Sequence, residues 1–326
     1  MPKNDTSVDL CVYDKCNNRC LMCTNPDRPW PAWDNKTGYN WRDIIGRLKK
    51  FRDKIDSAES IYLSGGEPTI HPRFREIIKY LTEKFSGKKI KLLTNGRFFS
   101  YPQKAEEFLA MGDNLEIDVS LYGHDKKTHE AVTRAAGSFD QTMAGLSNLL
   151  KRKKPSQLIG ARFVITRLSY QNIKPVLKLI LDNFPTIDRL IVIFPEMEGQ
   201  AIKNKKNVAL TYAQVRPFIN QIAELAPKFK EFRLYHFPLC TLDKKIWPYA
   251  WRTLPAKEIK FLPACNLCQV KNHCLGIHRG YLAHIGRDGF QPYKNKVATK
   301  STGNPYQPLA EIEKSAQNQA KTKTKI

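Results

Sequence analysis

The stretch VDLCVYDKCNNRCLMC occupies residues 8–23, and the stretch SIYLSGGEPT occupies residues 60–69. Each begins with a short run rich in Val, Ile and Leu, as buried parallel strands do, and each continues into a loop with polar or glycine residues. In parallel α/β sheets the functional groups gather beyond the carboxyl ends of the strands. The sequence therefore predicts a functional site at these two loops.

The same alternation continues through the middle of the chain. Strand-like runs occur at Val8–Tyr13, Ile61–Ser64, Ile90–Thr94, Leu115–Leu121, Gly160–Ile165 and Leu190–Phe194, with helical stretches at about 40–52, 73–85, 102–111, 139–152 and 172–184. Six strands joined by helical crossovers predict an α/β fold, specifically a partial parallel (βα)6 barrel that resembles a TIM barrel.

The chain divides into three predicted regions. Residues 1–235 form the barrel core, with a polar excursion over 198–212 and then a helix from Tyr212 to about Lys228. Residues 236–290 are irregular, rich in Pro, Gly and Trp, and form a small metal-binding extension. Residues 291–326 are a basic, flexible tail, because the end of the chain has few apolar residues.

The eight cysteines fall into two groups, one near each end of the chain. The start of the chain has no apolar signal segment, so we expect a cytoplasmic protein with reduced cysteines that bind metal. In the first group, Cys16, Cys20 and Cys23 are spaced to hold three irons of a four-iron cluster and to leave the fourth iron open. The alternative is a zinc knuckle with Cys11 as fourth ligand, but Cys11 lies inside a predicted strand and is interpreted as a core residue.

The second group is Cys240, Cys265, Cys268 and Cys274, with the spacing C-x2-C-x5-C after Cys240. Four thiolates can fully ligate a second iron–sulfur cluster or a structural zinc ion, and spacing alone does not separate these metals. If Cys240 is out of reach, the candidate fourth ligands are His236, His273, His278 and His284.

These motifs together resemble the radical SAM superfamily over about residues 8–200. The resemblance implies that the open iron of a [4Fe–4S] cluster binds the amino and carboxylate groups of S-adenosylmethionine. It further implies reductive cleavage to a 5′-deoxyadenosyl radical, which abstracts hydrogen from a substrate. An electron donor such as ferredoxin or flavodoxin is implied as a partner.

Further motifs at strand ends match the family's binding positions. Ser64-Gly-Gly-Glu-Pro68 resembles the family's GGEP motif, in which glycines let the backbone approach a ligand and a carboxylate pairs an ammonium. The other matches are the Thr-Asn-Gly motif with Asn95, Ser120 as the family's ribose-binding serine, Arg134 for the methionine carboxylate, and Met197 at the family's position beside the adenine. In all, the resemblance assigns S-adenosylmethionine binding to Gly65, Gly66, Glu67, Asn95, Ser120, Arg134 and Met197.

The second cysteine group resembles the short "twitch" extension of radical SAM enzymes and falls short of the full SPASM pattern. Its surroundings, from Leu234 to Gly276, resemble peptide-maturing members such as the C-type radical SAM protein of the His-Xaa-Ser system. The sequence after Gly276 departs from that pattern. The resemblance implies a maturase acting on a peptide or protein, with a second [4Fe–4S] cluster.

The net charge leaves a second interpretation open. There are 54 Lys plus Arg against 31 Asp plus Glu, a net charge of +23. This excess fits a tRNA or rRNA substrate, an acidic peptide, or a lysine-rich surface without a partner. The alternatives to a maturase are thus an RNA-modifying radical enzyme and a non-enzymatic zinc-binding nucleic-acid module. No apolar run is long enough to predict a membrane span.

Overall fold

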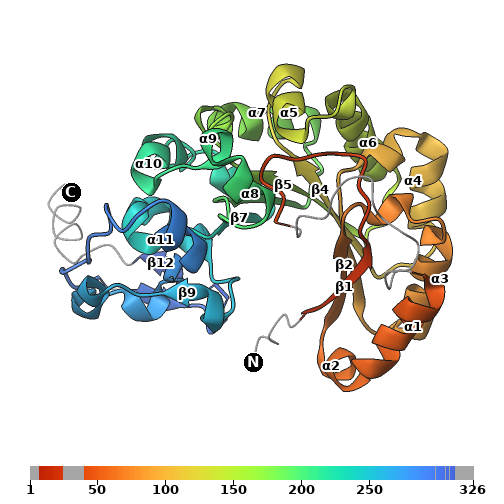
Figure 1. The fold of residues 1–326 in the computed structure, drawn as a ribbon, viewed down its shortest axis with the longest axis horizontal. Coiled ribbons are helices and arrows are strands. Elements are labelled where there is room, and N and C mark those ends of the chain that lie inside the picture. Colours follow the sequence, from red (N-terminus) through yellow and green to blue (C-terminus); the bar gives the residue numbers. More distant parts are fainter. Residues whose placement is uncertain (1–6, 25–39, 298, 305, 308, 313–326) are drawn as a thin grey trace, which may run out of the picture.

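Consecutive parallel strands build the centre of the computed structural model, which describes residues 7–24, 40–297, 299–304, 306–307 and 309–312. Each strand pairs with the next, so within these residues eight strands form one curved sheet in the order β1 to β8 (Figure 1). They are β1 (Ser7–Tyr13), β2 (Ser60–Gly65), β3 (Lys89–Thr94), β4 (Leu115–Leu121), β5 (Leu158–Val164), β6 (Arg189–Ile193), β7 (Phe232–Tyr235) and β8 (Ala250–Trp251).

The predicted α/β class and the parallel sheet are confirmed. All six predicted strands are present, and β7 and β8 extend the sheet beyond them. Both added strands are short, and their sequences do not form an apolar run of the kind that marks the others. Strands β1 and β8 do not pair with each other, so the described sheet stays open and does not close into a barrel.

Amphipathic helices cover the outer side of the curved sheet (Figure 1). Helix α1 shows how: the Asn40 side chain caps it by accepting a hydrogen bond from Asp43 N at 3.0 Å, and Ile44 and Leu48 are buried one turn apart. The core helices are α1 (Trp41–Lys50), α2 (Arg52–Ser57), α3 (Phe74–Lys84), α4 (Pro102–Leu109), α5 (Lys126–Thr133), α6 (Ser138–Arg152) and α7 (Ile173–Asn183). None of the described helices is both long and apolar enough to cross a membrane.

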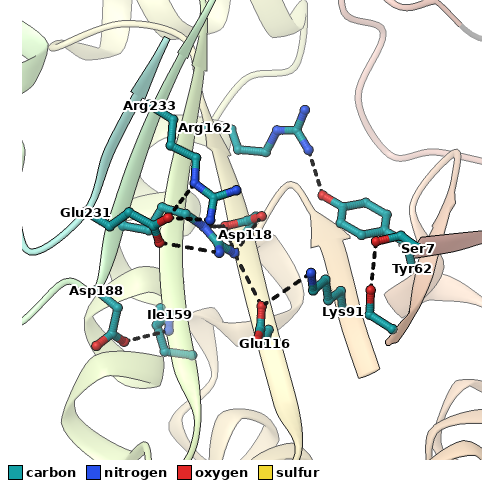
Figure 2. Close-up of polar contacts among 12 residues, drawn as sticks. Ser7, Tyr62, Lys91, Glu116, Asp118, Ile159, Arg162, Asp188, Glu231 and Arg233 are labelled. Carbon is teal, nitrogen blue, oxygen red and sulfur yellow. Dashed lines mark hydrogen bonds and ion pairs between the residues drawn. The ribbon is translucent and has the colours of Figure 1, made fainter. Parts of the chain in front are cut away.

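The inner face of the sheet is polar and charged. In β4 the residues that point to the helices are apolar and buried, whereas Glu116 and Asp118 point to the other face. There Arg189 of β6 donates hydrogen bonds to both carboxylate oxygens of Asp118 at 3.0–3.2 Å (Figure 2 shows this layer). The strands are therefore less uniformly apolar than the sequence prediction assumed, because an open sheet leaves an inner surface that can hold ion pairs.

After β6 the chain differs in detail from the predicted elements. The polar excursion contains two short helices, α8 (Gln200–Lys203) and α9 (Lys205–Val208). The helix that we predicted to reach Lys228 ends earlier, as α10 (Tyr212–Asn220), and is followed by a separate 3-10 turn, η4 (Ala226–Lys228). The residues between α10 and η4 form hydrogen-bonded turns instead of a continuous helix.

The C-terminal part consists mainly of 3-10 turns and short strand pairs. Its elements are η5 (Leu239–Thr241), η6 (Lys244–Tyr249), η7 (Ala256–Glu258), β9 (Ile259–Lys260), η8 (Pro263–Leu267), η9 (Lys271–His273), β10 (Ile277–His278), α11 (Arg279–His284), β11 (Thr299–Ser301) and β12 (Leu309–Ile312). Strands β9 and β10 pair, as do β11 and β12, both antiparallel. The predicted tail thus includes a strand pair, and its last residues, 313–326, lie outside the described part.

Candidate functional site

The loop with the first cysteine group runs against the loop that follows β2. Gly66 N donates a hydrogen bond to Tyr13 O at 2.7 Å, and Glu67 N donates one to Lys15 O at 2.8 Å. A Cβ atom on Gly65 would lie 2.0 Å from Tyr13 O. One on Gly66 would lie 2.1 Å from Lys15 O. Both positions therefore require glycine because two backbones touch there, a packing role that sequence analysis did not anticipate.

The other side of the cysteine loop is fixed by helix α5 and by the polar excursion. Leu21 N donates to Val132 O at 3.0 Å, at the end of α5. Gln200 N donates to Cys23 O at 2.8 Å, and the Asn204 side chain donates to Leu21 O at 3.1 Å. The excursion over 198–212 is thus a support for the loop, which its polar composition did not reveal.

The three thiols of the first group lie close to one another in a shielded position. Burial raises the pKa of Cys16 to about 12, and the nearby Glu67 carboxylate adds to that shift. Burial also raises the pKa of Cys20 above its usual range, with contributions from Cys16 and Cys23. Free thiols in this position stay protonated at neutral pH, whereas coordination to a metal deprotonates a thiol outright. Three soft donors in one loop suit an iron–sulfur cluster, in which each thiolate binds a different iron.

Glu67 ties the ends of β2 and β3 together. Its Oε1 atom accepts hydrogen bonds from the hydroxyls of Thr69 (2.6 Å) and Thr94 (2.7 Å), and its Oε2 atom accepts one from Asn95 N (2.7 Å). The side chain is only 1% exposed. A carboxylate oxygen has two lone pairs, so Oε2 keeps one for a further donor.

Asn95 and Arg97 connect the third strand end to the cysteine loop. The Asn95 side chain donates to Asn17 Oδ1 at 2.6 Å and also lies by the Cys16 thiol. Arg97 Nη1 donates to Asn17 O at 2.5 Å and to Asn18 Oδ1 at 2.8 Å. Arg97 was not among the predicted site residues. Its position directly after the Thr-Asn-Gly motif is the signal that could have indicated it.

Ser120 lies at the end of β4, and Tyr122 follows it on the same face. The Tyr122 hydroxyl lies near both the Ser120 hydroxyl and the Cys20 thiol. Burial raises the pKa of Tyr122 well above its usual value, so its hydroxyl remains a proton donor. Tyr122 is a second site residue that the sequence analysis missed.

The remaining two predicted positions border the same loop in different ways. Met197 is buried and packs with Leu21 and Met22 of the cysteine loop. Arg134 ends helix α5 in a left-handed conformation with φ of 54°, and its side chain is exposed. The structure thus brings the predicted residues of five strand ends to one edge of the sheet, with Arg134 at the rim.

The second cysteine group surrounds a cavity. The cavity is partly open to solvent and is lined by all four cysteines of the group together with apolar residues such as Phe261, Ile277 and Phe290. The lining includes none of His236, His273, His278 and His284, so Cys240 is the better fourth candidate. Trp247 supports the turn that carries Cys240 by donating to Leu239 O at 2.9 Å.

Backbone N–H groups already point at two of these sulfur atoms. Leu239 N and Gly276 N lie 3.5 and 3.4 Å from Cys274 Sγ, and Tyr293 N lies 3.3 Å from Cys268 Sγ. Such donors favour the thiolate form that a metal or cluster needs. The four sulfurs, their N–H donors and the apolar lining fit a fully ligated cofactor. Within the described residues, no three His, Cys, Asp or Glu side chains are arranged to hold a single metal ion.

Cys11 differs from its prediction. It lies in β1 as expected, but it is half-buried rather than part of the core, and its sulfur would be 2.9 Å from a Cβ on Gly65. The position pairs with Ser64 of β2 in the parallel register. Cys11 therefore borders the glycine loop, because that inner edge of the sheet is not covered by helices.

An open parallel sheet presents three thiols and a glycine-rich loop at its carboxyl edge, where α/β proteins carry their functional sites. The family model of the Radical SAM superfamily matches residues 10–180, more than half of the chain. The chain belongs to this superfamily, whose members are enzymes, and membership implies a [4Fe–4S] cluster with S-adenosylmethionine.

Several relatives are named for their functions. The chain is 22% identical over 242 residues to the tungsten-containing aldehyde ferredoxin oxidoreductase cofactor-modifying protein of Pyrococcus furiosus, covering 71% of this chain and 62% of that protein. It is 31% identical over 134 residues to the mycofactocin maturase MftC of Mycobacterium tuberculosis, covering 41% and 32%. These alignments span less than two thirds of either relative.

Among solved structures, SuiB of Streptococcus suis bound to its precursor peptide SuiA has a similar fold. The TM-score is 0.53 at 17% identity, and the match covers 70% of this chain and 48% of SuiB. The likeness confirms the fold. The twitch or SPASM character of the C-terminal part stays a prediction.

Proposed function

We propose that this chain is a maturase that uses radical chemistry on a peptide or protein substrate, with Cys16, Cys20 and Cys23 as the ligands of its catalytic [4Fe–4S] cluster. The observation that carries this assignment is the gathering of these three shielded thiols against the glycine loop. When bound and reduced, the cluster supplies the electron that cleaves S-adenosylmethionine to a 5′-deoxyadenosyl radical. An electron donor of the ferredoxin or flavodoxin type would deliver that electron.

The residues around the cluster position would hold S-adenosylmethionine. Gly65 and Gly66 fix the loop, and Glu67 offers the remaining lone pair of Oε2 to the ammonium group. Ser120 would bind the ribose hydroxyls. The assignments of Asn95, Arg134 and Met197 rest on the family resemblance together with their positions around the loop.

We assign the second cysteine group to an auxiliary [4Fe–4S] cluster, held by Cys240, Cys265, Cys268 and Cys274. The support is the shared cavity and the backbone N–H donors at two of the sulfurs. Residues 1–235 would then be the catalytic core and 236–290 the auxiliary unit, with 291–326 following it. Four thiolates leave no open ligand position, so this unit would transfer electrons or shape the substrate site.

A peptide substrate is supported by the relatives. MftC is named a maturase, and SuiB was solved with a precursor peptide bound. The net charge of +23 would favour encounter with an acidic peptide.

Anaerobic reconstitution tests the proposal in two stages. With iron, sulfide, dithionite and S-adenosylmethionine, we expect about eight irons per chain, four for each cluster, and formation of 5′-deoxyadenosine. Synthetic peptides encoded by reading frames beside the gene should then change in mass only with the complete system. Zinc in place of iron at both sites would contradict the enzyme assignment, and a mass change in tRNA but in no peptide would contradict the substrate.

A further inference from the structure

Two arginines lie on the inner face of the sheet and differ in how they are paired. Arg189 of β6 forms three hydrogen bonds to Asp118 and lies 3.7 Å from carboxylate oxygens of Glu116 and Glu231. Its charge is fully compensated by the protein. Its carboxylate partners Glu116, Asp118 and Glu231 are labelled in Figure 2.

Arg162 of β5 has no such direct compensation. Its Nη1 atom donates to the Tyr62 hydroxyl at 2.6 Å, and its guanidinium lies 5.9 Å from the Tyr235 ring centre. No carboxylate lies within 4 Å of Arg162 in the part of the chain that the structure describes. Figure 2 shows the guanidinium directed at the Tyr62 hydroxyl and away from Glu231. A neutral phenol is therefore the direct partner of this positive charge.

An arginine without a direct carboxylate partner keeps the capacity to bind an added anion. Burial of a charge costs several kcal/mol unless an opposite charge and hydrogen bonds replace water. Asp9, Asp118 and Glu196 attract Arg162 at longer range, but both oxygens of Asp118 are engaged by Arg189. Arg162 is half-buried, and the one hydrogen bond of its guanidinium within the described residues is the bond to Tyr62, so its other N–H groups could serve a ligand. A guanidinium fork matches a carboxylate or a phosphate.

The position of Arg162 connects it to the catalytic edge. Arg162 is the registered partner of Ser120 on the neighbouring strand, so both side chains point to the inner face. Ser120 in turn lies near Tyr122, whose hydroxyl lies near Cys20. An anion bound by Arg162 would lie on the inner face of the sheet. It would lie over β5, one strand farther from the cysteine loop than Ser120 of β4.

We propose that Arg162, supported by the Tyr62 hydroxyl, is the group that recognises a carboxylate or phosphate of the substrate. The inference rests on the proposed function and names the substrate class: the group to be modified carries an anion, such as an acidic side chain or the C-terminus of a peptide. The carboxylate of S-adenosylmethionine has the same chemistry, so the experiment separates the two sources.

The test measures two affinities on the anaerobically reconstituted protein. Glutarate is the anionic probe and glutaramide its neutral counterpart, both titrated with S-adenosylmethionine present. The affinity for S-adenosylmethionine is measured separately by equilibrium dialysis. The variants are Arg162→Met, Arg162→Lys and Tyr62→Phe, and Arg167→Met is the matched control because Arg167 is exposed just beyond the same strand.

We expect glutarate, and not glutaramide, to bind the unmodified protein saturably. Arg162→Met should weaken glutarate binding about tenfold or more, which is the loss expected for a charged hydrogen-bonded pair. Arg162→Lys keeps the charge without the planar fork, so its glutarate affinity should lie between those of the unmodified protein and Arg162→Met. Tyr62→Phe should weaken glutarate binding less than Arg162→Met does. Arg167→Met should leave glutarate binding unchanged. Affinity for S-adenosylmethionine should change less than about twofold, because the inference assigns the arginine to the substrate instead of to that molecule.

Two results would overturn the inference. An equal loss of S-adenosylmethionine affinity in Arg162→Met and Arg162→Lys would assign the arginine to that molecule, and unchanged glutarate binding in folded Arg162→Met would make it structural. A separate measurement shows whether the proposed function itself fails: the unmodified protein would then form no 5′-deoxyadenosine.

Discussion

The two cysteine groups are held by different kinds of structure. The first lies in a loop that is bonded to the β2 loop, to α5 and to the polar excursion, all at one edge of a parallel sheet. The second is carried by 3-10 turns around a cavity, beside the two-residue strands β9 and β10, and Ile277 of β10 lines that cavity. In the proposed assignment, a loop fixed from several sides would present three thiols and keep one metal position open, whereas four thiols around one cavity would occupy every position of a bound group.

Loss of a thiol from the first group should have the largest effect. Cys20→Ser removes one of three ligands, so the cluster with the open iron cannot form and no radical is generated. We expect 5′-deoxyadenosine formation to fall below detection, with about four irons per chain remaining at the second site. Product analysis by liquid chromatography and an iron assay would show it, and full activity in this variant would refute the assignment.

The corresponding loss of a thiol from the second group should affect substrate modification without affecting cleavage of S-adenosylmethionine. Cys268→Ser removes one of four ligands and one sulfur that accepts a backbone hydrogen bond. We expect about half of the iron to be lost while S-adenosylmethionine is still cleaved, because the first loop is held independently. Substrate modification should fail. The iron assay and the uncoupled cleavage rate measure this, and loss of cleavage as well would show that the two sites are not independent.

The third-largest effect is expected from a change at Gly66, where the glycine loop contacts the cysteine loop. Gly66→Ala places a methyl group 2.1 Å from Lys15 O, so one loop must move. We expect a loss of stability of about 1–3 kcal/mol, as for other overpacked sites, and weaker S-adenosylmethionine binding. Gly46→Ala in α1 is the control, because a Cβ there meets nothing within 4 Å. Thermal unfolding compares them, and a Gly66→Ala midpoint as high as that of the control would contradict the close contact.

The smallest expected effect concerns the border between the sheet and the C-terminal part. Burial raises the pKa of Glu196 to about 7, with Glu198 and Glu258 adding to the rise and Arg162 opposing it; His236 Nδ1 is 3.4 Å from Glu196 Oε1. A carboxyl whose pKa is raised on folding destabilises the fold progressively as pH rises from its unfolded pKa to its folded one. Glu196→Gln should therefore stabilise the protein, by about 1 kcal/mol more at pH 8.5 than at pH 6. Tm values measured at both pH values test this, and a constant difference would contradict it.

Sequence patterns were sufficient for the parts of the molecule that depend on local order. Apolar runs predicted the six long strands, and the positions after them placed Gly66 and Asn95 beside the cysteine loop. The supports were not predictable, because they depend on distant contacts: Arg97 reaches a residue 80 positions away. Nothing in the sequence separates Arg162 from Arg189, since only the folded sheet shows which of them has a carboxylate partner.

The central claim is that one cysteine group binds S-adenosylmethionine through an open iron and the other does not. Electron paramagnetic resonance of the dithionite-reduced, reconstituted protein, recorded with and without S-adenosylmethionine, tests it directly. We predict two overlapping signals, of which one shifts with S-adenosylmethionine, disappears in Cys20→Ser and persists in Cys268→Ser. A spectrum that does not respond to S-adenosylmethionine, or a response that survives in Cys20→Ser, would contradict the account.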